Sequence, residues 1–158
     1  MKTGHRGQVL VLVAIALFAL MGFAALAVDV GYMYTVRHEL QRCADAGALA
    51  GASAFNELAF PWSPISTDVG PQEAARRARD YASRDMVATS PLDPAVGEVR
   101  VTFDPLLDNQ VKVTTSRNVT LFFVPIFGMN NTTIGASAVA RAYNRAGPPP
   151  DNSVQLVE

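Results

Sequence analysis

The sequence predicts an α+β protein with a long N-terminal helix, a four-stranded antiparallel sheet and one short helix. Three observations lead to this prediction. Residues 9–28 are twenty consecutive residues without a charge. Residues 29–56 continue a helical pattern without a proline, and residues 99–143 contain runs that alternate between apolar and polar side chains. The 158 residues leave room for one domain beside this apolar segment.

The apolar run at 9–28 has the length of a transmembrane helix. At 1.5 Å per residue, it spans roughly the 30 Å hydrocarbon core of a bilayer. Lys2 and Arg6 precede the run and Asp29 follows it, and basic residues before a span favour a cytoplasmic N-terminus. We therefore predict a cytoplasmic leader at 1–8, a transmembrane segment at 9–28, and a C-terminal domain on the periplasmic or extracellular side.

The same stretch also has features of a cleavable signal sequence. Ala25-Leu26-Ala27 matches the small-x-small pattern, and cleavage after Ala27 would release a secreted or periplasmic binding module that begins at Val28. The apolar run is longer than the usual core of a signal sequence, and no helix breaker follows it. A retained anchor is therefore the leading interpretation, with release after Ala27 as the alternative.

The second part of the long helix, residues 29–56, carries a ridge of small side chains one helical turn apart. Such a ridge lets another backbone approach closely. Each glycine in a helix costs about 1 kcal/mol relative to alanine, which indicates a packing partner that compensates. The partner can belong to the same chain or to a neighbouring one. The predicted helix-packing interface consists of Ala44, Gly47, Ala48, Gly51 and Ala52.

Asp29, directly after the apolar run, is the charge whose position matters most. A carboxylate that reaches the acyl region of a bilayer is costly, so its place at the membrane boundary indicates a role. We consider two interpretations. Asp29 ends the membrane segment at the level of the lipid head groups, or it pairs with a basic group of a neighbouring subunit and so selects its partner.

Residues 57–143 are predicted to form the folded α+β region. Pro71 is suited to the first turn of a helix that continues to about Met86. Four strands are predicted at 99–103, 111–113, 119–124 and 133–143, and alternate positions of the last strand are almost all alanine. That thin face suits close contact with the small-residue side of the long helix. The Pro-rich residues 144–158 are predicted to be a flexible tail.

A dense apolar cluster surrounds Pro125 and has two interpretations. It is either part of the domain core, or an exposed patch that docks on a membrane surface or on another subunit. The cluster comprises Phe122, Phe123, Ile126 and Phe127.

The sequence carries no pattern typical of an enzyme. The two histidines have no metal-ligand spacing, and nucleophile-elbow and phosphate-binding motifs are absent from the sequence. With 13 basic and 14 acidic side chains, no strong positive field indicates nucleic acid. We therefore predict no catalytic residues, cofactor or metal. Cys43 is the single cysteine, either a small apolar residue on a helix face or a site for an intermolecular disulfide.

The N-terminal third resembles the TadE/TadG-like proteins of the bacterial tight-adherence (Flp) pilus assembly system. The residues that carry this resemblance are Arg6-Gly7, Asp29-Val30-Gly31, Leu40-Gln41, Ala44-Asp45-Ala46 and Ala48-Leu49-Ala50-Gly51-Ala52. The strand region, with VRVTF, VKVTTS and TIGASAVARA, is similar in order and spacing. Cys43 and Gly47 stand where the family more often has alanine.

The resemblance implies a single-span protein of the bacterial inner membrane with a pilin-like exported domain. Its implied role is to build or anchor an adhesive pilus or a related secretion apparatus, through helix bundling and lateral subunit contacts. The implied partners are the lipid bilayer and other pilus-assembly subunits or copies of itself. Cleavage after Gly7 by a prepilin-type peptidase is a further alternative, although Leu12 stands where pilins usually carry a glutamate.

Overall fold

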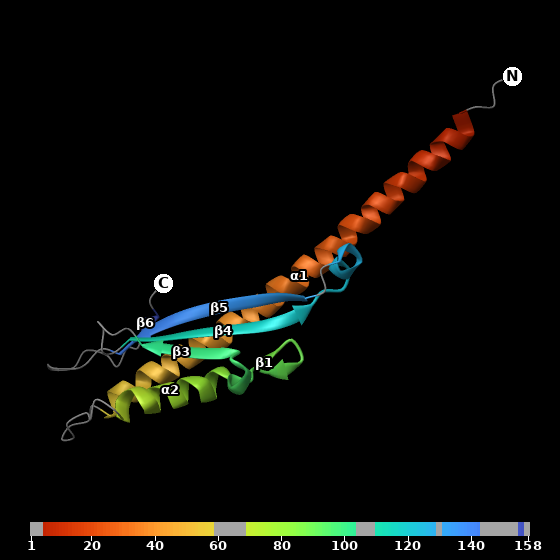
Figure 1. The fold of residues 1–158 in the computed structure, drawn as a ribbon. Helices are drawn as coiled ribbons and strands as arrows, with labels where there is room; N and C mark the ends of the chain where they lie inside the picture. The colour runs from red at the N-terminus through yellow and green to blue at the C-terminus, as the bar shows by residue number, and fades with distance from the viewer. Residues whose placement is uncertain (1–4, 59–68, 104–109, 129–130, 143–154, 157–158) are drawn as a thin grey trace. The chain divides into compact units, whose positions relative to one another are not determined.

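The computed structural model describes residues 5–58, 69–103, 110–128, 131–142 and 155–156. Within these ranges the chain is α+β, as predicted (Figure 1). The elements in chain order are α1 (His5–Leu58), α2 (Val69–Ala82), β1 (Met86–Val87), β2 (Ser90–Pro91), the 3₁₀ turn η1 (Pro94–Val96), β3 (Val99–Phe103), β4 (Gln110–Thr120), the 3₁₀ turn η2 (Val124–Phe127), β5 (Asn131–Arg141) and β6 (Gln155–Leu156).

The predicted long helix is confirmed, because α1 runs without a break from His5 to Leu58. Ala27 and Asp29 lie inside it, so the helix does not stop where the apolar run ends. The chain divides into two compact units, which we describe separately. The first, here the N-terminal unit, comprises residues 1–35 and 119–132, and the second, the sheet unit, comprises 36–118 and 133–158.

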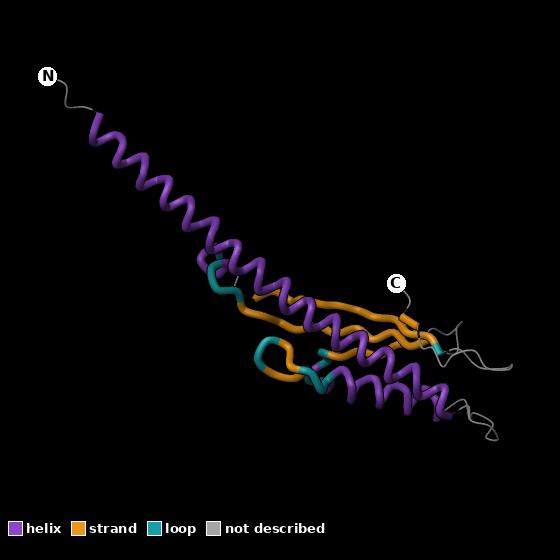
Figure 2. The backbone as a smooth tube through the Cα atoms, turned by 180° about the vertical axis from the view of Figure 1, so that it is seen from behind, coloured by secondary structure: helices purple, strands orange, loops and turns teal. Residues whose placement is uncertain are grey.

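One face of α1 forms the core of the sheet unit, and the sheet lies alongside it (Figures 1 and 2). Positions three and four residues apart are buried, while Arg37 and Arg42 on other sides are exposed. The buried hydroxyl of Thr115 on β4 donates a hydrogen bond of 2.9 Å to the carbonyl of Leu40, which joins the sheet to the helix. The buried positions include Val36, Leu40, Cys43, Ala44, Ala48, Ala52 and Phe55.

The main sheet has the strand order β3-β4-β5-β6. Strands β3 and β4 are antiparallel with Val101 opposite Val113, and β5 and β6 are antiparallel with Ala140 opposite Leu156. The alanine face predicted for the last long strand turns inward in part, since Ala138 and Ala140 on β5 are buried.

The predicted strand at 99–103 is confirmed as β3, and the one at 133–143 largely coincides with β5, but the other two need correction. The runs 111–113 and 119–124 are not separate strands, because β4 extends from Gln110 to Thr120 and the chain then leaves the sheet. Pro125 lacks an N–H group and fixes its own backbone angle, so the chain forms η2 there instead of continuing the strand. The fourth strand is β6, which lies within the predicted tail. Residues 144–154 and 157–158 of that tail lie outside the described ranges.

The short helix α2 also ends earlier than predicted. It stops at Ala82, and Met86 instead begins a two-stranded hairpin in which Val87 lies opposite Ser90. At the hairpin turn Ala88 has a φ of 59°, in the left-handed region that alanine rarely adopts. The carboxylate of Glu39 on α1 accepts the Ala88 N–H at 2.7 Å. Tertiary contacts therefore override the helical pattern after Ala82.

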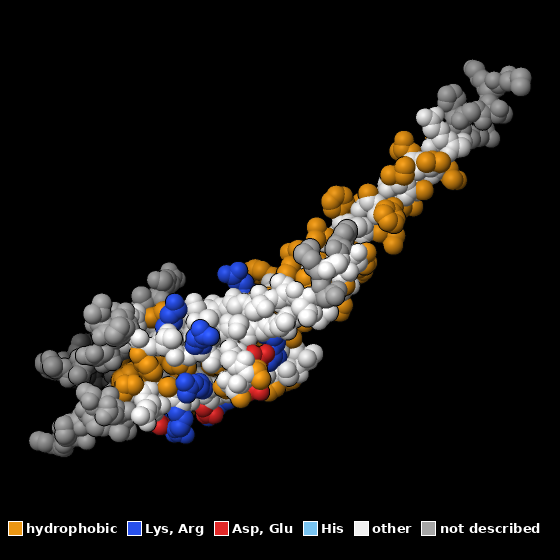
Figure 3. Space-filling view, in the orientation of Figure 1, with side chains coloured by type: hydrophobic (Ala, Val, Ile, Leu, Met, Phe, Trp, Pro, Cys, Tyr) orange, Lys and Arg blue, Asp and Glu red, His pale blue; other side chains and the backbone are white. Residues whose placement is uncertain are grey.

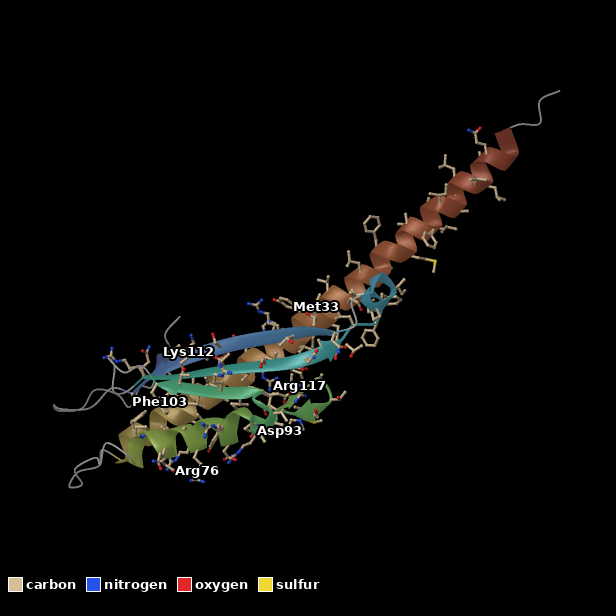
Figure 4. The ribbon with its side chains drawn as sticks, viewed as in Figure 1. Met33, Arg76, Asp93, Phe103, Lys112 and Arg117 are labelled. Carbon is tan, nitrogen blue, oxygen red and sulfur yellow. The ribbon has the colours of Figure 1, made fainter. Side chains whose placement is uncertain are left out.

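Arg117 on β4 holds this hairpin to the main sheet (Figure 4). Its guanidinium donates to the carbonyls of Val87, Ser90 and Pro91 at 2.7–2.8 Å. It also forms a two-point pair with Glu98, at 3.0 Å from Nε to Oε1 and 2.7 Å from Nη2 to Oε2. Both side chains are largely buried, at 10% and 20% exposed. The hydrogen bond from Arg117 lowers the pKa of Glu98 below its ordinary value, although burial opposes this.

We predict that Glu98→Gln destabilises the sheet unit at neutral pH and less so in acid. Removing one partner of a buried ion pair typically costs about 3–5 kcal/mol, because the other charge stays buried. The pKa of Glu98 is lower in the folded chain, so its stabilisation is complete above the ordinary glutamate pKa of about 4.3. It is lost as the pH falls through the lower, folded value. The measurement is thermal unfolding of the full chain in detergent across this pH range.

The control is Asp85→Asn, which removes an exposed ion pair with Arg42. Such surface pairs contribute about 0–1 kcal/mol, so this variant should stay close to the parent. Equal pH profiles for Glu98→Gln and the parent chain would contradict the prediction.

Candidate functional site

The structure describes residues 5–58, 69–103, 110–128, 131–142 and 155–156. Within those ranges, no group of three or more His, Cys, Asp or Glu side chains could hold a metal ion. Cys43 is buried on α1, and burial raises the pKa of its thiol. This environment fits the first interpretation of Cys43, a small apolar residue on a helix face. The candidate functional features are the small-residue ridge, Asp29 and the apolar half of α1.

All five residues of the predicted helix-packing interface are buried. Ala44, Ala48 and Ala52 have no exposed surface, and Gly47 and Gly51 complete the ridge.

The two glycines lie under α2 and β4. A Cβ atom at Gly47 would stand 2.8 Å from the carbonyl oxygen of Ala78 and 2.9 Å from the Cβ of Ala82. At Gly51 it would stand 2.9 Å from a methyl carbon of Val111 and 3.1 Å from the Cβ of Ala78. Both positions are therefore closed to any side chain larger than hydrogen.

The partner of the ridge is a second row of small residues on α2. Ala74, Ala78 and Ala82 follow one another at four-residue spacing and are fully buried. Two facing rows of small side chains allow two helix backbones to approach closely. The sequence left open whether the partner belongs to the same chain, and in this structure it does. The ridge is thus occupied by the protein's own α2 and β4.

Asp29 lies on α1 directly after the apolar run and is fully buried. Its Oδ1 accepts the backbone N–H of Phe122, and its Oδ2 accepts those of Phe123 and Val124, each at 2.9 Å. An ionised carboxylate is an acceptor at both oxygens, which matches three donors. Asp29 is also the single charged residue within 7–35 and 119–132, the ranges that build most of the N-terminal unit.

This contact was named by neither interpretation of Asp29 from the sequence. The carboxylate is engaged by the chain's own loop, which connects β4 to β5. The ring of Phe122 also packs edge-on against Tyr32 of α1, with ring centres 5.4 Å apart. The available signal was a strand interrupted at Pro125, which leaves N–H groups outside a ladder. The sequence pattern near Pro125 does not show that these N–H groups bond to Asp29, more than ninety positions away.

The N-terminal part of α1 presents apolar side chains that the described chain does not cover. It is the one helix in the described residues that is long and apolar enough to cross a membrane. On the face shown in Figure 3, hydrophobic side chains gather along this stretch, whereas the Lys, Arg, Asp and Glu side chains gather over the sheet unit. Phe18 is 82% exposed. The candidate processing residues Gly7 and Ala27 are also exposed on α1.

We predict that Gly47→Ala destabilises the sheet unit, whereas Gly31→Ala does not. The new methyl group at residue 47 would collide with the α2 backbone, and overpacking of this kind costs about 1–3 kcal/mol. At Gly31 an added Cβ meets nothing within 4 Å, so the change should gain up to about 1 kcal/mol of helix propensity. The midpoints of thermal unfolding of the two full-length variants in detergent test this. Equal midpoints would show that the ridge is not tightly packed.

We also predict that Asp29→Asn loosens the loop at residues 122–124. The asparagine amide has one acceptor oxygen. Its NH₂ group would take the place of the second carboxylate oxygen and would face a backbone N–H donor. Amide hydrogen exchange at the three residues should become roughly tenfold faster or more, as local opening becomes easier. Asp45→Asn, on the same helix, is the control and should leave exchange there unchanged. Identical exchange in both variants would contradict the assignment.

Comparison with known families gives two overlapping matches. Residues 7–54 match the Flp pilus-assembly TadE/G-like family. Residues 37–140, about two thirds of the chain, match a Tad-like Flp pilus-assembly family. Comparison with curated proteins and with solved structures finds no match.

The matched ranges include the features described above. They contain the apolar run, the small-residue ridge, α2 and nearly all of β3, β4 and β5. The family resemblance suggested by the N-terminal motifs is therefore confirmed over the helix and the sheet together. The chain belongs to the Tad-like family of Flp pilus-assembly proteins.

Proposed function

We propose that this protein is a membrane-anchored structural or assembly subunit of a tight-adherence type pilus or a related secretion apparatus. The observation that carries this proposal is the uncovered apolar half of α1, which continues without a break into the sheet unit. Twenty uncharged residues in water would be unfavourable, whereas in a bilayer they match the hydrocarbon core. The pilus role itself comes from the family.

In this proposal the protein crosses the bacterial inner membrane once. Lys2 and Arg6 keep the leader in the cytoplasm, and the sheet unit lies in the periplasm or outside the cell. No step of the role requires catalysis, a cofactor or a metal. The protein acts by holding a folded domain at the membrane and by contacting other subunits or copies of itself.

The packing in the sheet unit limits how helix bundling can occur. The ridge at Gly47 and Gly51 is already filled by α2 and β4, so a neighbouring helix cannot use it without displacing α2. Bundling is therefore assigned to the segment at 9–28, whose side chains are uncovered. Lateral contacts with other subunits would use the exposed outer surface of the sheet unit.

The alternative is a secreted or periplasmic binding module released after Ala27. The unbroken α1 favours the anchor, because Val28 is a residue in the middle of a helix and not the start of a folded unit. Intact mass and N-terminal sequencing of protein from its native host separate the cases. A start at Met1 indicates a retained anchor, at Gln8 a processed pilin, and at Val28 a released module.

We predict that Phe18→Arg prevents normal membrane insertion and abolishes assembly into surface filaments. A charged side chain near the centre of a transmembrane helix costs about 2.5–3.5 kcal/mol on insertion scales. Phe18→Leu keeps the apolar character and is the matched control. The measurements are membrane fractionation and electron microscopy of surface filaments in the native bacterium. Wild-type protein recovered as soluble material that begins at Val28 would refute the anchor.

A further inference from the structure

The loop at residues 121–128, between β4 and β5, exposes large apolar side chains. Ile126 is 79% exposed and Phe122 is 64% exposed, and Phe123 is exposed as well. The sequence left open whether this cluster belongs to the core or forms a docking patch. Of its members, Phe122, Phe123 and Ile126 lie at the surface, and the side chain of Phe127 is outside the described part of the chain.

The Asp29 carboxylate fixes the height of this loop along α1. It accepts the N–H groups of Phe122, Phe123 and Val124 at 2.9 Å, so these residues lie beside the first residue after the apolar run. Consecutive helix residues are separated by about 1.5 Å along the axis, so Asp29 stands within one turn of the last residues of the run. If residues 9–28 span the bilayer, the loop lies at its outer boundary.

The chemistry of the loop suits that position. Residues 119–132 contain no charged side chain, and the charge of Asp29 is itself buried against the loop backbone. Exposed apolar side chains continue along the neighbouring part of α1 at Leu26, Val28 and Val30. Loop and helix therefore both present uncharged, exposed apolar side chains in the N-terminal unit. For comparison, the apolar face of an interfacial helix inserts about 5–10 Å into the region between head groups and acyl chains.

We propose that the loop at residues 121–128 is a second membrane contact, which inserts Phe122 and Ile126 into the outer-facing leaflet of the membrane that α1 crosses. This inference rests on the proposed transmembrane role of residues 9–28. The occupant is lipid because the loop is held by Asp29 at the boundary of the proposed span and adds exposed apolar side chains there, with no charge. The hydrogen bonds to Asp29 lower the free-energy cost of inserting the loop, because three backbone N–H groups stay paired where water is scarce.

The test uses the full chain in vesicles of phosphatidylethanolamine and phosphatidylglycerol. In a Cys43→Ala background, single cysteines at Ile126, Phe18 or Val96 carry an environment-sensitive fluorophore. Val96 is the matched control, because it is also an exposed apolar residue, at 72%, in a 3₁₀ turn that ends at a left-handed glycine. Vesicles with brominated acyl chains then report which probes contact lipid.

The expected result is a blue-shifted emission at Ile126 and Phe18, with loss of most of the intensity in brominated vesicles, and neither effect at Val96. Quenching at Phe18 without quenching at Ile126 would leave the transmembrane anchor standing and overturn the loop contact. No quenching at Phe18 would overturn the anchor itself, and the loop contact with it. A blue shift at Ile126 without lipid quenching, but with energy transfer between labelled copies, would assign the loop to a second copy and refute the lipid contact.

Discussion

Backbone N–H groups that lie away from water need a partner within the chain, and this constraint organises the N-terminal unit. Helix α1 satisfies its own backbone along the apolar run, as an α-helix does between its ends. The loop after β4 cannot do the same, because Pro125 interrupts the strand and frees the N–H groups of residues 122–124. The carboxylate of Asp29 accepts all three. The charge that follows the apolar run therefore holds the loop to α1.

The sheet unit depends instead on the small size of the residues between α1 and α2. Gly47 and Gly51 let α2 approach α1 until a single methyl group would not fit between them. Facing rows of glycine and alanine are usually considered as contacts between subunits, but here both rows belong to one chain. Close helix packing within the unit positions β4, and Arg117 on β4 in turn holds the hairpin of β1 and β2. The small residues of α1 and α2 therefore affect the positions of β4, β1 and β2, which lie far from α1 in the sequence.

Local and long-range features differ in how far the sequence could predict them. The long helix, its apolar half and the ridge at 44–52 follow from periodicity and residue size, which are local properties. The hairpin at Met86 and the end of β4 at Thr120 do not, since they depend on Glu39, Arg117 and Asp29, which bond to residues far along the chain. Pattern alone also treats 111–113 and 119–124 as two strands, because nothing local shows that the residues between them continue the ladder.

The surfaces that the chain itself covers limit where specific contacts with another subunit could form. A ridge that is filled by its own chain contributes stability but cannot recognise a neighbour. The apolar half of α1 is uncovered. If it spans a bilayer as proposed, lipid would solvate it as well as another apolar helix does, so bundling there would gain little from apolarity alone. Gly22, with nothing within 4 Å of an added Cβ, is the point on that half where another helix could approach most closely. In that proposal, recognition between copies would depend on shape at such small residues, while Asp29, which is engaged by the loop at 122–124, would serve the fold of each copy.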